Sequence, residues 1–335
     1  MTERSIQSAA RLLCIGFDGP VPTPEARDLV RLGVRSVILF ARNAGSRVEV
    51  AATIARVKAL ATDPTDPILV CVDQEGGGTV RFRDGFDPPP SMREVGLGGV
   101  DSASEVGTRL AADLRPIGVD LDLAPVVDVD SNPANPVIGS RSFGRDPGEV
   151  GRCGAALVQA MQSGGVAACG KHFPGHGDTD SDSHHDLPVL RHGMERLDLV
   201  ELPPFRAIIE ADVASIMTTH VVFEALDPGV PATMSRPAID GLLRENLGFD
   251  GVVVSDDLEM AAIADLPELR GDLGEAAVRA VDAGVDLVLC CHEPTRQRRV
   301  IEALAGAIDS GRLGEDRIAA AHRRLDRLFD RFVRP

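Results

Sequence analysis

Short, unbroken apolar runs recur along the chain and give the first indication of its fold. Runs such as ILVCV (68–72) and GVVVS (251–255) do not alternate with polar residues, which is typical of strands buried on both faces of a parallel sheet. We predict strands at residues 12–17, 36–40, 68–73, 119–127, 166–173, 214–221, 251–256 and 284–291.

Segments with helical periodicity lie between these runs. We predict helices over 48–60, 103–114, 150–161 and 238–247. Eight strands alternating with helices predict an α/β fold, a single (β/α)8 TIM barrel. No linker, composition shift or internal repeat divides the chain, so residues 1–335 are expected to form one catalytic domain. Its core spans about 12–310, and a C-terminal helix covers about 314–332.

An open, doubly wound sheet is the alternative architecture. Its usual signature is a glycine-rich dinucleotide loop after the first strand, but here that strand is followed by DGPVPTP (18–24). Three glycines follow the third strand at 76–78, without the Lys and Ser or Thr of a phosphate-binding loop. The barrel is therefore favoured.

Charge and aromatic content narrow the classes of partner. The chain carries 51 acidic and 35 basic residues, a formal charge of −16, which disfavours nucleic acid and anionic membranes as partners. It has 11 Phe but no Trp or Tyr, which weakens a role that depends on aromatic stacking. Any ring beside a leaving group would have to be a phenylalanine such as Phe82, Phe86 or Phe143.

Cysteine usage and hydropathy bear on the compartment. Six cysteines in a chain of 335 residues do not form a disulfide scaffold, and reduced core thiols are expected. No apolar stretch approaches the roughly 20 residues of a membrane span, and the N-terminus has no run long enough for a signal-peptide core. A cytoplasmic protein is predicted.

Ionisable residues gather where the predicted strands end. They occur in DQE (73–75), DVD (128–130), KH (171–172), TH (219–220) and SDD (255–257). In a parallel barrel the loops after the strands form the working face. Charged groups at five strand ends would each pay a desolvation cost unless they met a partner or ligand, so this face is the predicted active site.

The segment 171–186 is the densest, with nine ionisable side chains in sixteen residues. An EF-hand is rejected, because Ser183 and Val189 occupy positions that a calcium loop gives to Gly and Glu. Pro174 and Gly175 forbid a helix that would bring His172 and His176 together as zinc ligands. A metal-dependent hydrolase built on the His and Asp residues of 172–186 remains an alternative.

A mechanism without a metal would pair Asp182 with His184, two residues further along the same loop. The carboxylate can hold the imidazole's tautomer and stabilise its charged form, which suits a general acid and base. Ser183 or Ser255 could serve as nucleophile, but the chain has no G-x-S-x-G motif. Asp256 at the end of the seventh strand is favoured instead, an arrangement similar to that of glycoside hydrolysis.

Five motifs, in order along residues 12–291, carry a family resemblance: VILFARN (37–43), VDQEGG (72–77), NPVIGSRSFG (135–144), KHFPGHGDTDSDSH (171–184) and LGFDGVVVSDDLEM (247–260). Together they resemble the family 3 glycoside hydrolases, specifically the single-domain NagZ-type β-N-acetylglucosaminidase branch. The resemblance implies a TIM barrel that needs no metal or other cofactor. It also implies retention of configuration and release of terminal N-acetylglucosamine from a small carbohydrate, with no nucleic acid or membrane partner.

The resemblance also implies residue roles. Asp256 is then the nucleophile, His184 the acid/base and Asp182 its partner. The residues implied to hold the sugar are Asp73, Arg81, Arg141, Lys171 and His172. Asp257 and Glu259 are expected to support the site or to be exposed.

One position departs from the family pattern. Where the branch commonly reads EGGRVQR, this chain reads EGGGTVR (75–81), so Gly78 replaces an arginine. The change bears on contacts to the leaving group more than on the reaction. Anhydromuramyl peptides and chitooligosaccharides are both candidate substrates. A phosphorylase that uses phosphate instead of water at the same residues is a further alternative, because a histidine repels phosphate less than a carboxylate does.

Overall fold

The computed structural model describes residues 1–183 and 187–334, and its centre is a closed barrel of parallel strands. Around the ring the order is β1, β2, β3, β6, β7, β9, β11 and β12, with β12 pairing back onto β1. The barrel strands are β1 (Leu13–Ile15), β2 (Ser36–Leu39), β3 (Leu69–Val72), β6 (Leu121–Asp122), β7 (Ala167–Phe173), β9 (Ser215–Thr218), β11 (Val252–Asp257) and β12 (Leu287–Cys290). Each overlaps a predicted strand, so the predicted TIM barrel is confirmed.

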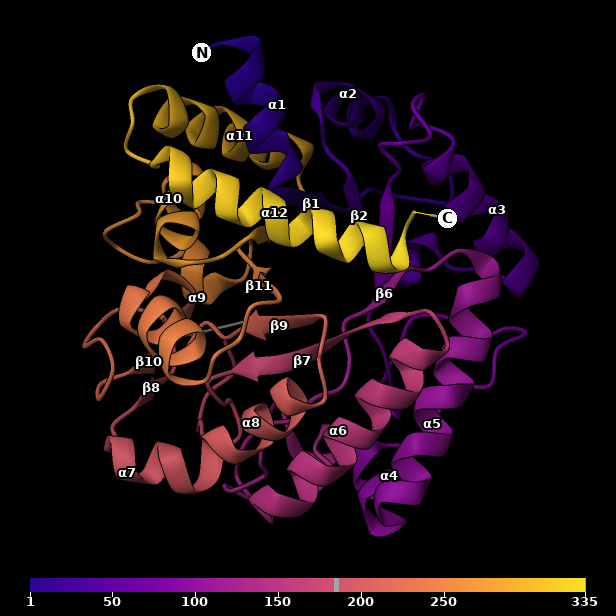
Figure 1. Cartoon of the computed structure of the whole chain (residues 1–335), viewed down its shortest axis with the longest axis vertical. Helices are drawn as coiled ribbons and strands as arrows, with labels where there is room; N and C mark the ends of the chain where they lie inside the picture. The colour runs from indigo at the N-terminus through magenta and orange to yellow at the C-terminus, as the bar shows by residue number, and fades with distance from the viewer. Residues whose placement is uncertain (184–186, 335) are drawn as a thin grey trace.

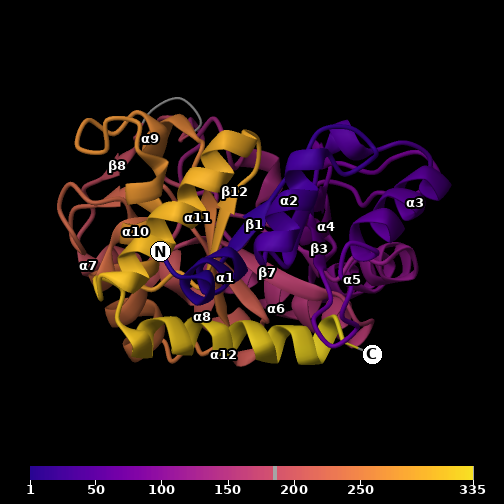
Figure 2. The same ribbon diagram turned by 90° about the horizontal axis from the view of Figure 1, so that it is seen from above.

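A long helix follows each barrel strand and packs outside it (Figures 1 and 2). In chain order these are α2 (Pro24–Leu32), α3 (Arg47–Lys58), α5 (Gly99–Leu114), α6 (Pro147–Ser163), α8 (Leu202–Glu210), η6 (Pro237–Asn246), α10 (Leu273–Ala283) and α11 (Pro294–Asp309). The helix predicted over 238–247 is η6, a wide π-helix rather than an α-helix.

Local sequence explains where several helices begin. Thr23 caps α2 by accepting a hydrogen bond from the N–H of Ala26, and Asp146 caps α6 in the same way through the N–H of Glu149. In both helices a proline occupies the first turn, where its missing N–H costs nothing. Caps of this kind fix where each helix starts relative to the preceding strand.

Shorter elements decorate the connections. The helical ones are α4 (Met92–Leu97), α7 (Met194–Arg196), α9 (Ala261–Ala264), η1 (Ala41–Asn43), η2 (Arg115–Ile117), η3 (Gly139–Arg141), η4 (Leu197–Glu201) and η5 (Ala232–Met234). Two small sheets pair β4 (Gln74–Gly76) with β5 (Thr79–Val80), antiparallel, and β8 (Val189–Leu190) with β10 (Val222–Phe223), parallel. In the part of the chain described, no helix is both long and apolar enough to cross a bilayer.

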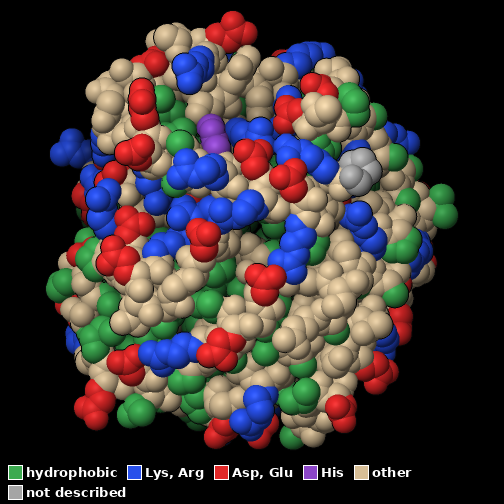
Figure 3. Space-filling view, in the orientation of Figure 1, with side chains coloured by type: hydrophobic (Ala, Val, Ile, Leu, Met, Phe, Trp, Pro, Cys, Tyr) green, Lys and Arg blue, Asp and Glu red, His purple; other side chains and the backbone are tan. Residues whose placement is uncertain are grey.

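The terminal helices α1 (Glu3–Arg11) and α12 (Glu315–Phe332) complete the fold, and α12 runs across the amino-terminal end of the barrel (Figures 1 and 2). Asp286, fully buried just before β12, lies 3.2 Å from Arg324 of α12 and 2.6 Å from Arg244. On this face basic and acidic side chains are interspersed (Figure 3). Because α12 covers one end, the opposite end, where the strands terminate, is left for a site.

Candidate active site

A cavity of about 590 Å³ lies at the carboxyl end of the barrel. Asp73 follows β3, Lys171 and His172 belong to β7, and Asp256 belongs to β11. Parallel strands bring their carboxyl ends together, which is why residues so far apart in sequence meet here. The predicted site residues that line the cavity are Asp73, Arg81, Arg141, Lys171, His172 and Asp256.

Asp256, half-buried near the end of β11, is the predicted nucleophile. Its Oδ1 accepts a 2.8 Å hydrogen bond from the N–H of Asp257. Burial favours a raised pKa for Asp256, but His220, His172, this hydrogen bond and Lys171 together hold the pKa below its usual value. The side chain is therefore an anion at neutral pH, as a nucleophilic carboxylate must be.

Lys171 is a buried cation held between two carboxylates. Its Nζ lies 2.8 Å from Asp73 Oδ1 and 2.7 Å from Glu75 Oε1. Burial would lower the pKa of Lys171, but the charges of Asp73 and Glu75 outweigh it and raise the pKa above its ordinary value. A fixed ammonium group at the cavity wall can donate to hydroxyl groups of a bound sugar.

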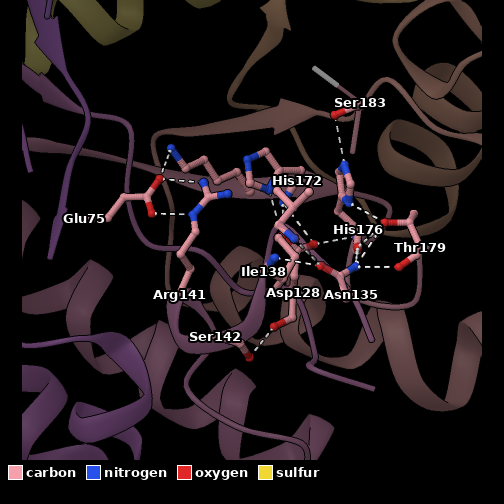
Figure 4. Close-up of polar contacts among 12 residues, drawn as sticks. Glu75, Asp128, Asn135, Ile138, Arg141, Ser142, His172, His176, Thr179 and Ser183 are labelled. Atoms are coloured by element: carbon pink, nitrogen blue, oxygen red, sulfur yellow. Dashed lines mark hydrogen bonds and ion pairs between the residues drawn. The ribbon is translucent and has the colours of Figure 1, made fainter. Parts of the chain in front are cut away.

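Glu75, which also lines the cavity, holds Arg141 through two hydrogen bonds (Figure 4). Its two carboxylate oxygens accept hydrogen bonds from Nε and Nη2 of Arg141, both at 2.8 Å. Burial of Glu75 would raise its pKa, but Arg141 and Lys171 hold that pKa well below the usual range. Glu75 belongs to DQE (73–75), one of the predicted strand-end groups, but no role in the site was predicted for it. The available signal was its position, two residues after Asp73 at the same strand end.

His172 is oriented by Asp128, which is fully buried. The ring Nδ1 lies 2.7 Å from Asp128 Oδ2, and the backbone N–H groups of His172 and His176 also point to this carboxylate. Burial raises the pKa of Asp128, but His172 and the hydrogen bonds bring it below the usual value. Because Asp128 accepts at Nδ1, Nε2 is the ring nitrogen available to a ligand. Asp128 belongs to DVD (128–130), one of the predicted strand-end groups, but its pairing with His172 was not predicted.

The predicted acid/base pair is only partly within the described structure. His184 lies outside the described residues, while Asp182 is half-buried and lies outside the cavity lining. Ser183, which joins them, is buried and lines the cavity. The chain between the two predicted residues thus reaches the same pocket as Asp256.

The histidines considered as metal ligands have other partners. His172 forms a hydrogen bond with Asp128, and His176 forms hydrogen bonds with Ser183 and Thr179. The two imidazole rings pack edge to face, with their centroids 5.9 Å apart. Within residues 1–183 and 187–334, no group of three or more His, Cys, Asp or Glu is arranged to hold a metal ion.

The aromatic ring at the cavity is not one of those expected. Phe82 and Phe143 are buried in the core, and Phe86 packs on Phe82 with ring centroids 5.4 Å apart. None of these three phenylalanines lines the cavity. Phe40 lines the cavity instead, with the guanidinium group of Arg42 4.4 Å from its ring centroid. Phe40 is the last residue of the second predicted strand, so looking for aromatic as well as ionisable residues at the strand ends would have identified it.

The wall opposite Asp73 is formed by residues after β11 and β12. Asp257 Oδ2 lies 3.1 Å from His292 Nε2, and this hydrogen bond raises the pKa of His292. Glu259 accepts the backbone N–H groups of His292 and Glu293 at 2.6 and 3.1 Å, just before α11. Asp257 and Glu259 thus have the supporting role expected of them.

Gly78, the departure from the family pattern, lies in the turn between β4 and β5 next to Thr79, which lines the cavity. A Cβ atom at Gly78 would have no neighbour within 4 Å. A side chain at this position would therefore start in open space.

Comparisons with known proteins agree with the geometry. Residues 12–328 match the sequence profile described as the glycosyl hydrolase family 3 N terminal domain. A protein of Thiobacillus denitrificans named beta-hexosaminidase is 42% identical over 278 residues, covering 81% of this chain and 75% of its own length.

Solved structures are similar over nearly the whole chain. A family 3 beta-N-acetylglucosaminidase from a Paenibacillus species is 42% identical with a TM-score of 0.93, covering 97% of this chain, while this chain spans only 62% of that protein. NagZ from Neisseria gonorrhoeae, solved with N-trifluoroacetyl-D-glucosamine, is 31% identical with a TM-score of 0.78, covering 94% of this chain and 97% of that one. By sequence and by fold, this chain belongs to glycoside hydrolase family 3, and the prediction of a glycosidase is confirmed.

Proposed function

We propose that the protein is a retaining, exo-acting β-N-acetylglucosaminidase that removes terminal N-acetylglucosamine from small glycoconjugates. The observation that carries the proposal is the meeting of Asp256 with Asp73, Lys171 and Arg141 in one cavity. This places an anionic nucleophile beside fixed hydrogen-bonding groups of both signs. The names of the relatives, beta-hexosaminidase and beta-N-acetylglucosaminidase, and the sugar bound to the Neisseria protein support the same substrate class.

In the proposed complex, charged side chains hold the sugar without a large aromatic platform. Asp73 accepts from sugar hydroxyls, while Lys171, Arg81 and Arg141 donate to sugar oxygens. His172, oriented by Asp128, adds Nε2 as a further polar contact. Because ion pairs already fix these groups, little side-chain entropy is lost on binding.

The proposed reaction has two steps. Asp256 attacks the anomeric carbon while His184 gives its proton to the departing oxygen, forming a glycosyl ester on Asp256 and releasing the leaving group. Asp182 stabilises the charged imidazole before that proton is transferred. His184 then takes a proton from water, which attacks the same carbon and frees Asp256. Two inversions give net retention.

The proposed substrates are muropeptides and chitooligosaccharides, and no cofactor is required. We further propose that residues 1–335 act as one catalytic unit, since α12 is tied by Arg324 to Asp286 at the barrel end. A cytoplasmic location is supported by six cysteines that are all free and buried, as expected in a reducing compartment.

The first test is release of 4-nitrophenol from 4-nitrophenyl N-acetyl-β-D-glucosaminide. Asp256→Ala is expected to abolish turnover, whereas Asp250→Asn, a change in an exposed carboxylate paired with Arg324 and Arg327 of α12, should retain it. Nuclear magnetic resonance of the first-formed product should show the β-anomer. Equal rates for wild type and Asp256→Ala, or an α-anomeric product, would contradict the proposal.

A second test separates the alternatives. Products from muropeptides and from chitobiose are identified in buffers with and without phosphate, before and after exhaustive chelation. Free N-acetylglucosamine in every case is expected. A sugar phosphate would indicate a phosphorylase, and activity lost on chelation and restored by metal would indicate a metal-dependent hydrolase.

A further inference from the structure

His176 is a buried histidine at the cavity that the proposed reaction does not use. It follows β7 by three residues and is 1% exposed. Its Nε2 lies 3.1 Å from Ser183 Oγ and its Nδ1 lies 3.0 Å from Thr179 Oγ1 (Figure 4). The ring therefore links the start of this loop to the residue immediately before His184.

Both ring nitrogens of His176 have hydrogen-bond partners. The Asn135 amide donates to Thr179 Oγ1 at 3.0 Å, and Thr179 Oγ1 lies 3.0 Å from His176 Nδ1 and 3.3 Å from the His176 carbonyl oxygen. Burial, with a smaller contribution from His172, lowers the pKa of His176 to about 4, so the ring is neutral at working pH. The Ser183 hydroxyl can both donate and accept, so it can form a hydrogen bond with Nε2 whichever ring nitrogen carries the proton.

The backbone around His176 is fixed as firmly as its ring. The His176 N–H donates to Asp128 Oδ1 at 2.7 Å, and the Asn135 amide donates to the His176 carbonyl at 2.8 Å. At Gly177 a Cβ would lie 1.7 Å from the carbonyl oxygen of Val129, so the chain can pass this close only as glycine. His176 is thus a rigid point from which Ser183 is held.

Ser183 is also held from the opposite side of the cavity. Its carbonyl oxygen accepts a 3.2 Å hydrogen bond from the N–H of Ala262 in α9, the short helix that follows β11. β11 carries Asp256. Ser183 is therefore fixed between the loop after β7 and the element that follows the proposed nucleophile.

We propose that His176 is a positioning residue, which through Ser183 fixes the point where the chain enters His184 so that the acid/base can reach the glycosidic oxygen. The inference rests on the proposed function, because it assigns His176 a task only if His184 is the acid/base. It predicts that weakening the contact between His176 and Ser183 impairs proton transfer rather than sugar binding.

The test compares leaving groups that differ in their need for a proton. Ser183→Ala and His176→Leu are assayed on chitobiose, whose leaving sugar must be protonated, and on the 2,4-dinitrophenyl glycoside, whose leaving group departs unaided. We expect kcat/KM to fall roughly tenfold on chitobiose, the order of one lost buried hydrogen bond, and less than about twofold on the dinitrophenyl substrate. kcat should fall on both, because His184 also activates water in the second step.

Three further variants make the test specific. His176→Gln keeps a donor near the position of Nε2 and should recover most of the loss. The double variant Ser183→Ala/His176→Leu should lose no more than either single one, because both remove the same contact. His322→Leu, a change in a half-buried histidine of α12 that bonds the Ser8 carbonyl, should leave kcat/KM unchanged on both substrates.

His184→Ala separates failure of the inference from failure of the proposed function. If kcat/KM of His184→Ala falls by the same factor on chitobiose and on the dinitrophenyl substrate, the proposed acid/base is wrong. If it shows the leaving-group dependence while Ser183→Ala does not, or if the double variant loses the product of the single effects, the positioning role is overturned. Should His176→Leu fail to fold, as judged by its thermal unfolding, Ser183→Ala and His176→Gln decide the question.

Discussion

The imidazole Nδ1 of His172 and the carboxylate of Asp128 are joined by a 2.7 Å hydrogen bond beneath the cavity. Asp128 is fully buried and also faces the backbone N–H groups of His172 and His176. The carboxylate thus fixes both the ring and the chain that carries it, so Nε2 is the ring nitrogen left free to contact a ligand.

Asp128→Asn is expected to weaken the hydrogen bonds that orient His172, while the side chain keeps nearly the same volume. The amide has one carbonyl oxygen for the N–H groups that the carboxylate now serves, so His172 loses its charged acceptor. We expect kcat/KM to fall by roughly 10- to 100-fold, the cost of one or two charge-assisted hydrogen bonds. Steady-state kinetics with a chitobiose substrate measure the change. An unaltered kcat/KM would show that the orientation of His172 does not matter.

Glu75→Gln is expected to destabilise the fold strongly. The change leaves the buried cation Lys171 and the half-buried cation Arg141 with less compensating charge, and breaking a buried pair in this way costs about 3 kcal/mol of unfolding free energy. Urea unfolding at pH 7 measures it. Glu275→Gln, which removes a partly exposed pair with Arg312, is the control and should cost less than about 1 kcal/mol. Similar losses in the two variants would contradict the prediction.

The same pair predicts how stability depends on pH. The pKa of Glu75 is held well below its ordinary value of 4.5, so its contribution is present above that value and is lost as pH falls through the lower, folded-state pKa. The difference in unfolding free energy between wild type and Glu75→Gln should therefore be constant from pH 5 to pH 8 and shrink on further acidification. A difference that grows in acid would contradict this sign.

Asp122→Asn is expected to stabilise the protein. Burial in β6 raises the pKa of Asp122 to about 8, so the folded state keeps a proton that the unfolded chain releases above about pH 4. Stability is therefore lost as pH rises from 4 to 8, and the neutral amide avoids this loss. We expect a gain of about 1 kcal/mol or more at pH 8 that vanishes near pH 4. Urea unfolding of both proteins between pH 4 and pH 8 measures the gain. A gain that does not depend on pH would contradict the prediction.

Gly78→Arg is expected to fold normally and to change leaving-group preference. A Cβ atom at this position would have no neighbour within 4 Å, so the side chain starts in open space and the melting temperature should hardly change. The new cation would lie beside Thr79 at the cavity and should lower KM for a muropeptide, whose leaving group carries carboxylates, more than for neutral chitobiose. Equal KM changes for the two substrates would place residue 78 outside the leaving-group site.

Sequence alone was sufficient for the architecture and for most of the candidate site. The runs at 68–72 and 251–254 carry no charged or polar side chain, and unbroken runs of this kind are typical of strands that a parallel sheet buries on both faces. Because the carboxyl ends of parallel strands meet at one end of a barrel, the positions of Asp73, Lys171 and Asp256 at strand ends predicted that they share one face. These are local properties, since periodicity and position at a strand end are already present in the linear chain.

Only the tertiary structure decided which charges meet. Glu75 and Arg141 are 66 residues apart, and Asp128 and His172 are 44 apart, yet each pair forms hydrogen bonds of 2.7 to 2.8 Å once the barrel closes. The same closure buried Phe82 and left Phe40 at the cavity. Residue type shows that a side chain can be charged or aromatic, but its partner depends on how neighbouring strands align, which no short segment encodes.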